Sequence, residues 1–263
     1  MSQVALRLTS VVVCLTLLSV ATGTRAATLI AFWPLEETDL AQGVVDSAGT
    51  LPPGTFPAAG VDPDVPGPPG FGSAVHFDGS GAIGAPNSIN VGGSNVLNLA
   101  NNFSVTAWVN FENLNGKHSI IGSTAWSFRS TGSRPHLTTF GIKDYFGDAG
   151  ALTQGEWIHM AMTLDSNNTA SFFVNGQPAG QDFHGAPGNT NVADFHLGIA
   201  RNQGSALETM FGSIDDVRVY EGVLTVDEIQ LIMNPIPEPS TVVLLVLGAL
   251  AVIPATRRRR TRS

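Results

Sequence analysis

Short segments of alternating apolar and polar residues fill most of the chain between residues 27 and 234, and turn-forming residues separate them. In the clearest of them, Phe103–Val109, almost every second side chain is apolar, which is typical of a β-strand with one buried face. Asn175-Gly176 follows an apolar run and favours a tight hairpin turn. Strands are predicted at Leu29–Leu35, Ser73–Phe77, Phe103–Phe111, His118–Gly122, Ser127–Arg129, Leu137–Ile142, Trp157–Leu164, Ala170–Val174, Asp194–Ile199 and Phe211–Tyr220. About ten short strands separated by turns predict an all-β fold, an antiparallel sandwich of two sheets.

Two segments depart from this strand pattern. Thr225-Val226-Asp227-Glu228 fits a capping box, in which Thr225 caps the first turn of a helix and Glu228 reaches back to it. The helix would be short, end near Pro235 and lie against an edge of the sandwich. The stretch from Leu51 to Gly72 contains seven prolines, which predict a surface loop that joins neither sheet.

The length of the chain allows one large domain or two small ones, and the composition is that of a folded protein. The chain has 263 residues, of which 43% are hydrophobic and only 13% are charged, so it can bury a sizeable core. Its single cysteine, Cys14, lies in an N-terminal apolar run. One cysteine excludes a disulfide framework within the chain and a zinc cluster built on paired cysteines.

The N-terminus has the features of a secretory signal peptide. An apolar run from Ser10 to Val20 follows Arg7, and small residues stand at Ala26 and Ala27, where a signal peptidase cleaves. The alternative is a membrane anchor, but the run is shorter than the ~20 residues that span a bilayer. We therefore predict a signal peptide over residues 1–26 and export from the cytoplasm.

The C-terminus, residues 235–263, carries three signals in a fixed order. A short motif of Pro237, Glu238 and Pro239 precedes an apolar run over residues 242–255, and the basic cluster Arg257, Arg258, Arg259 and Arg260 follows. An apolar segment backed by arginines is typical of a stop-transfer helix whose basic end stays in the cytoplasm. The alternative interpretation of this tail is an ordinary membrane anchor.

This tail resembles the PEP-CTERM sorting signal of Gram-negative bacteria that make exopolysaccharide. The resemblance implies that the tail is the substrate of an exosortase, a membrane-embedded cysteine protease, and that it contains no catalytic residue. It also implies a place in the cell envelope, at the cell surface or in the extracellular matrix.

The charge of the exported part is strongly acidic. Residues 27–238 contain six basic and 21 acidic residues, a net charge of −15, because the other basic residues lie in the two terminal signals. Such a surface repels nucleic acid and anionic lipid headgroups. It is compatible with neutral polysaccharides and attracts divalent cations.

Residues 27–234 resemble the concanavalin A-like, laminin G-like jelly roll. The resemblance rests on four blocks in the family's order, 74–81, 103–109, 156–176 and 211–229, together with Trp33-Pro34-Leu35 near the start. It implies a two-sheet jelly roll with one short helix near its C-terminal end. The family contains both binding domains and enzymes, so the site has to decide the function.

The sequence lacks the carboxylate pattern of the glycoside hydrolases that use this scaffold. Those enzymes place two carboxylates close together on one strand in a Glu-x-Asp-x-(x)-Glu pattern, because a retaining mechanism needs an acid and a nucleophile ~5 Å apart. Here Asp215 and Asp216 are consecutive and would point to opposite faces. We therefore predict an exported, non-catalytic envelope or matrix protein that binds glycan or a partner surface. The alternatives are a glycan-cleaving enzyme and a structural matrix protein that associates with itself.

Two sets of residues are candidates for binding. Strand alternation would place Asp215 on the inward face with Val217 and Val219, where a carboxylate needs a hydrogen-bond donor or a cation. Calcium at a similar rim is common in the laminin G-like family, which implies a structural Ca²⁺ held by Asp215 with Asp46 or Asp78. The alternative is hydrogen bonding to loop amides. The second set is an aromatic platform for a sugar, predicted at Trp126 and Tyr145.

Overall fold

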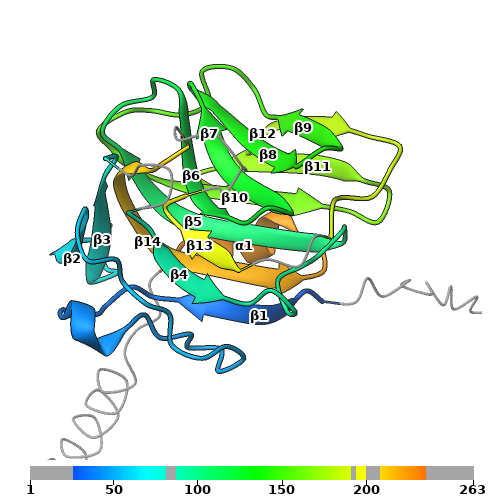
Figure 1. Cartoon of the computed structure of the whole chain (residues 1–263). Coiled ribbons are helices and arrows are strands. Elements are labelled where there is room, and N and C mark those ends of the chain that lie inside the picture. Colours follow the sequence, from blue (N-terminus) through cyan, green and yellow to red (C-terminus); the bar gives the residue numbers. More distant parts are fainter. Residues whose placement is uncertain (1–25, 81–86, 191–193, 200–207, 235–263) are drawn as a thin grey trace, which may run out of the picture.

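The computed structural model describes residues 26–80, 87–190, 194–199 and 208–234. These residues form two antiparallel β-sheets packed face to face, with one short α-helix against the larger sheet, as shown in Figure 1. The prediction of an all-β sandwich of two sheets with one short helix is therefore confirmed.

The larger sheet has eight strands. Along the sheet their order is β12 (Gln177–Phe183), β11 (Thr169–Val174), β10 (Trp157–Leu164), β5 (Phe103–Phe111), β14 (Phe211–Glu221), β3 (Ser73–Asp78) and β2 (Val61–Pro66), and β1 (Thr28–Trp33) pairs with the second half of β14. The smaller sheet has six strands, in the order β4 (Ile89–Gly92), β13 (Phe195–Leu197), β6 (Lys117–Gly122), β7 (Trp126–Thr131), β8 (Arg134–Thr139) and β9 (Lys143–Phe146). A 3₁₀ turn, η1 (Leu40–Gln42), lies in the segment after β1.

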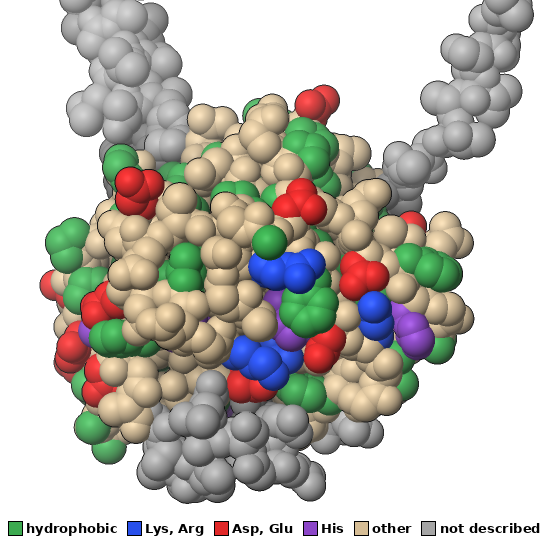
Figure 2. Space-filling view, turned by 90° about the horizontal axis from the view of Figure 1, so that it is seen from above, with side chains coloured by type: hydrophobic (Ala, Val, Ile, Leu, Met, Phe, Trp, Pro, Cys, Tyr) green, Lys and Arg blue, Asp and Glu red, His purple; other side chains and the backbone are tan. Residues whose placement is uncertain are grey.

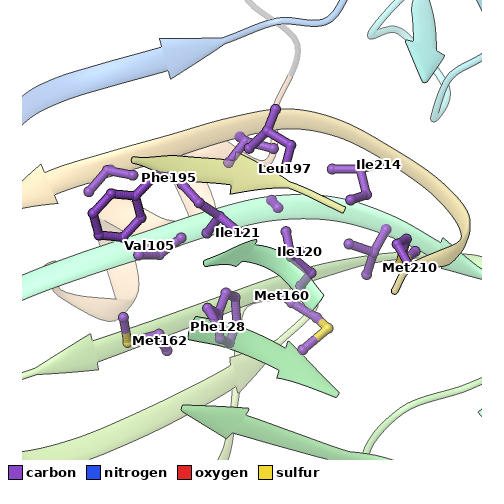
Figure 3. Close-up of a cluster of buried hydrophobic side chains, with 14 of the residues drawn as sticks. Val105, Ile120, Ile121, Phe128, Met160, Met162, Phe195, Leu197, Met210 and Ile214 are labelled. Carbon is purple, nitrogen blue, oxygen red and sulfur yellow. The ribbon is translucent and has the colours of Figure 1, made fainter. Parts of the chain in front are cut away.

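The hydrophobic core fills the space between the two sheets. On β5 the predicted inward residues Phe103, Val105, Ala107 and Val109 are all fully buried, which confirms the alternation that the sequence shows. Figure 3 shows the two inner faces meeting, with Val105 and Met160 from the larger sheet near Ile120 and Phe128 from the smaller one.

Local sequence signals set the turn and the helix. Asn175 and Gly176 both have positive φ angles, 49° and 69°, as a two-residue hairpin between β11 and β12 requires. The helix α1 (Val226–Ile232) has the predicted capping box, with Thr225 at the N-cap and Glu228 bonded back to it. Its buried Ile229 belongs to a small apolar cluster with Ala161 and Phe173, which lie on interior strands of the larger sheet. The helix therefore packs on the outer face of this sheet, and its predicted place at an edge of the sandwich is wrong.

The sequence pattern missed four strands, β2, β4, β9 and β12. The prediction that residues 51–72 join no sheet is wrong, because Val61–Pro66 pairs with β3 as an edge strand. An edge strand tolerates Pro63 because only one side of its backbone needs partners, and the ladder is interrupted there by a bulge between Asp62 and Val65.

A bulge in β14 also changes the predicted direction of Asp215. The register shifts between Asp215 and Arg218, and Asp216 at the bulge has a φ of 49°. Asp215 is paired with Trp108, whose neighbours Ala107 and Val109 face the core. Because residues directly opposite each other share a face, Asp215 lies on the outer face of the larger sheet, and its predicted inward direction is wrong.

The two terminal signals lie outside the described residues. This applies to residues 1–25 of the predicted signal peptide, to the motif Pro237, Glu238 and Pro239, and to the cluster Arg257, Arg258, Arg259 and Arg260. Among the described residues, none of the helices has the length and hydrophobicity to span a membrane.

Candidate functional site

The outer face of β6–β9 carries polar side chains because the strands alternate. Phe128 and Leu137 are paired and face the core, so the next pair along these strands, Arg129 and His136, faces outward. On β9, Asp144 pairs with Thr138 on the same outer face. The smaller sheet therefore presents a row of polar groups to the side away from the core.

A hollow of about 340 Å³ lies over this face. Its charged lining consists of Lys117, Arg129, Lys143, Asp144 and Glu208, and Phe140 and Ile142 add apolar surface. Figure 2 shows a face of the molecule on which Lys and Arg side chains gather among Asp, Glu and His side chains.

The charged residues form a continuous chain of ion pairs, here called the ionic chain. Lys117 Nζ lies 3.2 Å from Glu208 Oε1, and the other oxygen of Glu208 accepts a hydrogen bond from Arg129 Nη1. Arg129 Nη2 lies 3.6 Å from Asp144 Oδ1, and the same oxygen lies 3.2 Å from His136 Nε2. The ionic chain thus alternates donors and acceptors along Lys117, Glu208, Arg129, Asp144 and His136.

Burial gives the ionic chain its electrostatic character. The side chain of Arg129 is only 2% exposed and that of Glu208 is 5% exposed, so each needs the other as its counter-charge. The imidazole of His136, whose Nε2 lies 3.2 Å from Asp144 Oδ1, holds the pKa of Asp144 well below its usual range, so Asp144 is an anion at neutral pH. Burial lowers the pKa of His136, which keeps its imidazole neutral.

The neighbouring contacts fix the tautomer of His136. Arg129 Nε donates to His136 Nδ1 at 3.1 Å, so this nitrogen is an acceptor. The ring proton then lies on Nε2, where it points at Asp144. The imidazole of His136 also stacks on the ring of Phe146, with 4.3 Å between the ring centroids. The guanidinium of Arg134 lies over the same Phe146 ring, 4.9 Å from its centroid. These contacts fix the orientation of the His136 ring on the outer face.

The predicted aromatic platform is wrong for both of its residues. Trp126 is fully buried between Phe103 and Phe195, with its Nε1 donating to the carbonyl of Leu97 at 3.0 Å. Tyr145 is fully buried as well. Neither ring has a face open to a sugar, because both alternate inward with the core residues of their strands.

Asp46 and Asp78 already serve as acceptors for backbone amides. Asp46 Oδ1 accepts from the amide of Phe32 at 2.8 Å, and its Oδ2 accepts from Thr50 and Leu51 at 2.9 Å each. Asp78 Oδ1 accepts from the amide of Ser80 at 2.9 Å. The part of the chain described by the structure contains no group of three or more His, Cys, Asp or Glu residues placed to hold a metal ion. Calcium binding at Asp215, Asp46 and Asp78 stays a prediction.

Asp215 belongs to a separate buried polar cluster on the outer face of the larger sheet. Trp108 is paired with Asp215 on one side and with His159 on the other. Asp215 is fully buried, and within the described part of the chain its Oδ2 and both ring nitrogens of His159 have no hydrogen-bond partner. Burial, reinforced by the charge of Asp216, raises the pKa of Asp215 to about 9. Burial lowers the pKa of His159 to about 3.

A larger hollow of about 450 Å³ lies beside the start of β1, next to Ala26 and Thr28. Its acidic groups include Asp165, whose Oδ1 already accepts from the amides of Asn167 and Thr169 at 2.9 and 2.8 Å. This hollow has no counterpart of the ionic chain among the described residues. We therefore place the candidate site over β6–β9.

Strand alternation in the sequence indicates part of this site. Ser127 and Arg129 alternate with apolar residues on β7, and His136 and Thr138 do so on β8. Glu208 could not be found in this way, because it lies outside the strands and is far from Arg129 in the sequence.

Comparison with known families and structures shows two kinds of similarity. The model of the concanavalin A-like lectin/glucanases superfamily matches residues 83–230, more than half of the chain. No curated protein sequence matches the chain significantly. Domain 4 of AbnA, an extracellular GH43 arabinanase from Geobacillus stearothermophilus solved with arabinotriose, is 22% identical with a TM-score of 0.60. The match covers 80% of this chain and 100% of that domain.

Two toxin domains have similar folds. The binding domain of Paraclostridial Mosquitocidal Protein 1 is 15% identical with a TM-score of 0.58, over 79% of this chain and 52% of that one. The receptor-binding domain of botulinum neurotoxin type G is 16% identical with a TM-score of 0.55, over 78% of this chain and 50% of that one. The chain therefore spans about half of each toxin domain, and these low identities establish a shared fold only.

Proposed function

Because the chain belongs to the concanavalin A-like lectin/glucanases superfamily, we propose that it is a non-catalytic glycan-binding protein whose site is the hollow over β6–β9. The observation that carries the proposal is the ionic chain, a row of fixed donors and acceptors beside the apolar surface of Phe140 and Ile142. Sugar rings present hydroxyl groups at their rim and C–H groups on their faces, and such sites combine the two kinds of contact.

The similar structures support this choice of ligand. One of them is a domain of an arabinanase that was solved with arabinotriose, and two are the binding domains of toxins. Each is one domain of a larger protein, which is consistent with a fold that attaches such proteins to their ligands. These similarities support glycan binding in general and no particular sugar.

The state of the two carboxylates in the hollow argues against catalysis. Glycoside hydrolysis needs one carboxylic acid that is protonated before it meets the substrate, and its pKa is therefore raised. The pKa of Asp144 is lowered, and Glu208 is ion-paired with both Lys117 and Arg129. Both groups thus serve as fixed acceptors in the proposed mechanism.

The alternative is a glycan-cleaving enzyme, which is favoured by the presence of Asp144 and Glu208 in the same hollow. Incubation of the full chain with a panel of polysaccharides separates the two functions. Retention without release of reducing ends supports a binding protein. Release that Glu208→Gln abolishes supports the enzyme and overturns our proposal.

We also propose export and sorting, on the evidence of the terminal sequences. Cleavage near Ala26 would leave β1, which begins at Thr28, at the start of the mature chain. The tail over residues 235–263 would be processed by an exosortase-type protease at the envelope. Mass spectrometry of the protein from a host with and without an exosortase tests this, and an unprocessed C-terminus in both hosts would contradict it.

Binding itself is tested with a matched pair of variants. Asp144 is a half-exposed member of the ionic chain, whereas Asp62 is an exposed carboxylate on β2 of the other sheet. Asp144→Asn should weaken glycan binding by about tenfold, the loss of one charge-assisted hydrogen bond. Asp62→Asn removes the same charge and should leave the affinity unchanged. Equal affinities of both variants and the parent protein would refute the proposed site.

A further inference from the structure

The basic residues of the described chain are unevenly distributed. Four of its five Lys and Arg side chains, namely Lys117, Arg129, Arg134 and Lys143, belong to β6–β9, and the fifth is Arg218 on the other sheet. In a protein this acidic, such a gathering would ordinarily suggest a site for an anionic ligand. The partners of these cations point to a different ligand.

Three of these four cations are already neutralised by the protein. Lys117 and Arg129 share Glu208, Arg129 also faces Asp144, and Lys143 Nζ lies 3.2 Å from Asp182 Oδ2. The fourth, Arg134, donates to the carbonyl of Gly147 at 2.9 Å and lies over Phe146. The imidazole of His136 adds no charge. The hollow therefore presents alternating charges with almost no net charge.

A carboxylate on the ligand would have to compete with these internal pairs. Arg129 and Glu208 have side chains that are 2% and 5% exposed, so separating them leaves a buried charge without a partner. Breaking one half of a buried pair costs more free energy than a new contact at the surface returns. The net charge of −15 over residues 27–238 repels an approaching polyanion as well.

A pair of neighbouring hydroxyl groups fits the same arrangement without breaking it. A hydroxyl both donates and accepts, so one hydroxyl can donate to Asp144 while its neighbour accepts from Lys117 or Lys143. Each contact is charge-assisted, and the ion pairs hold the groups in place beforehand. Ile142, which is 41% exposed, and Phe140 lie beside these groups and offer apolar surface to the C–H face of a sugar.

We propose that the hollow over β6–β9 selects neutral glycans with neighbouring free hydroxyl groups and excludes glycans that carry carboxylate or sulfate groups. This inference rests on the proposed function and names the class of its ligand. The internal ion pairs act as the selecting element, because they satisfy every strong cation in the hollow before a ligand arrives.

The test uses polysaccharides that differ only in charge. Binding of the purified full chain is measured by calorimetry with polygalacturonate and with the same polymer after reduction of its carboxyl groups to alcohols, and with arabinan as a second neutral probe. We expect a neutral probe to bind at least about tenfold more tightly than the acidic one. Its affinity should change less than about twofold between 50 and 500 mM NaCl, because no net charge is neutralised.

The outcomes separate this inference from the proposed function. Tighter binding of the acidic polymer, weakened by salt, would overturn the selectivity and leave glycan binding intact. A lack of binding to these probes and to a wider glycan panel would overturn both proposals.

A charge variant gives an independent reading. Asp144→Asn removes one of the two carboxylates that face Arg129. The ratio of the affinities for the neutral and the acidic polymer should therefore fall by about tenfold, and binding of the acidic polymer should become dependent on salt. Asp62→Asn, on the other sheet, should keep the parent preference. Thermal unfolding of both variants checks that the fold is retained. An unchanged preference in Asp144→Asn, with the fold intact, would refute the role given to the ion pairs.

Discussion

The buried carboxyl of Asp215 makes the stability of this protein depend on pH in an unusual direction. With a pKa of about 9, Asp215 carries a proton in the folded protein at neutral pH, whereas an unfolded Asp loses it near pH 4. Between these two values the folded state binds one more proton than the unfolded state. The free energy of unfolding therefore falls as the pH rises through this window.

The size of the effect follows from the difference between the two pKa values. Each pH unit is worth about 1.4 kcal/mol, so the loss between pH 4 and pH 7 is about 4 kcal/mol. Asp216, whose pKa burial raises to about 6, adds to the loss in the same direction. Below pH 4 both carboxyls are protonated in either state, so their contribution to the stability no longer changes with pH. Glu36 and Arg218, the other charged groups that act on Asp215, shift its pKa in opposite directions.

Asp215→Asn tests this account because an amide resembles a protonated carboxyl in shape and has no charge at any pH. Its Oδ1 can still accept from the amide of Asp216, as Asp215 does at 2.8 Å. We expect the variant to match the parent protein near pH 4 and to be more stable by up to about 4 kcal/mol at pH 7. Urea unfolding of the full chain at pH 4, 5, 6, 7 and 8 measures the difference, with Asp62→Asn as the exposed control.

Two results would refute the reasoning. A constant loss of stability in Asp215→Asn at every pH would mean that Asp215 acts only through its hydrogen bond. A variant that is less stable than the parent above pH 6 would mean that Asp215 is ionised and compensated. The second result is the one that the predicted calcium site requires. It should then be accompanied by a rise in the melting temperature of the parent protein at millimolar calcium, absent from the variant.

Three further substitutions test the fold and the site. Arg129→Met leaves Glu208 buried without its main partner and should lower the free energy of unfolding, measured in urea, by about 3–5 kcal/mol. The double variant Arg129→Met/Glu208→Leu should lose less, because it leaves no buried carboxylate at position 208. Phe128→Ala opens a cavity in the core and should cost about 3–5 kcal/mol in the same assay, and a loss below 1 kcal/mol would contradict the packing. Thr225→Ala removes the cap of α1 and should cost about 1 kcal/mol, whereas Thr225→Ser should unfold at the same urea concentration as the parent.

The sequence predicted the elements whose signals are local. β5, β10 and β14 alternate strongly, and the capping box and the Asn-Gly turn depend on neighbouring residues only. The missed strands are short or lie at edges. β9 has four residues and β2 contains two prolines, so neither has an alternation long enough to stand out.

The misplaced site residues have a common physical reason. A single bulge at Asp216 puts Asp215 on the opposite face of the sheet from Val217, and nothing in the amino-acid sequence indicates this bulge. Aromatic residues often bind sugars, which favours a platform at Trp126 and Tyr145, but on their strands both side chains occupy inward positions. Strand alternation was the better guide, since it predicts that Arg129 faces outward.

Each sheet buries an ionisable side chain on its outer face, Asp215 on the larger sheet and Arg129 on the smaller one. The surroundings of these two side chains differ, and this difference indicates where a ligand can bind. On the larger sheet Phe71 packs on Trp108 at 5.4 Å, and a Cβ atom on Gly67 would lie 3.2 Å from Asp215 Oδ2. Backbone and side chains thus close this face, and Asp215 keeps its proton because burial disfavours its anion. On the smaller sheet Arg129 is equally buried, but carboxylates on two sides compensate it and a hollow stays open above. A ligand can therefore reach the paired charges over the smaller sheet but not the protonated Asp215 on the larger one. Paired charges next to open space favour the recognition of hydroxyl groups over that of an ionic group.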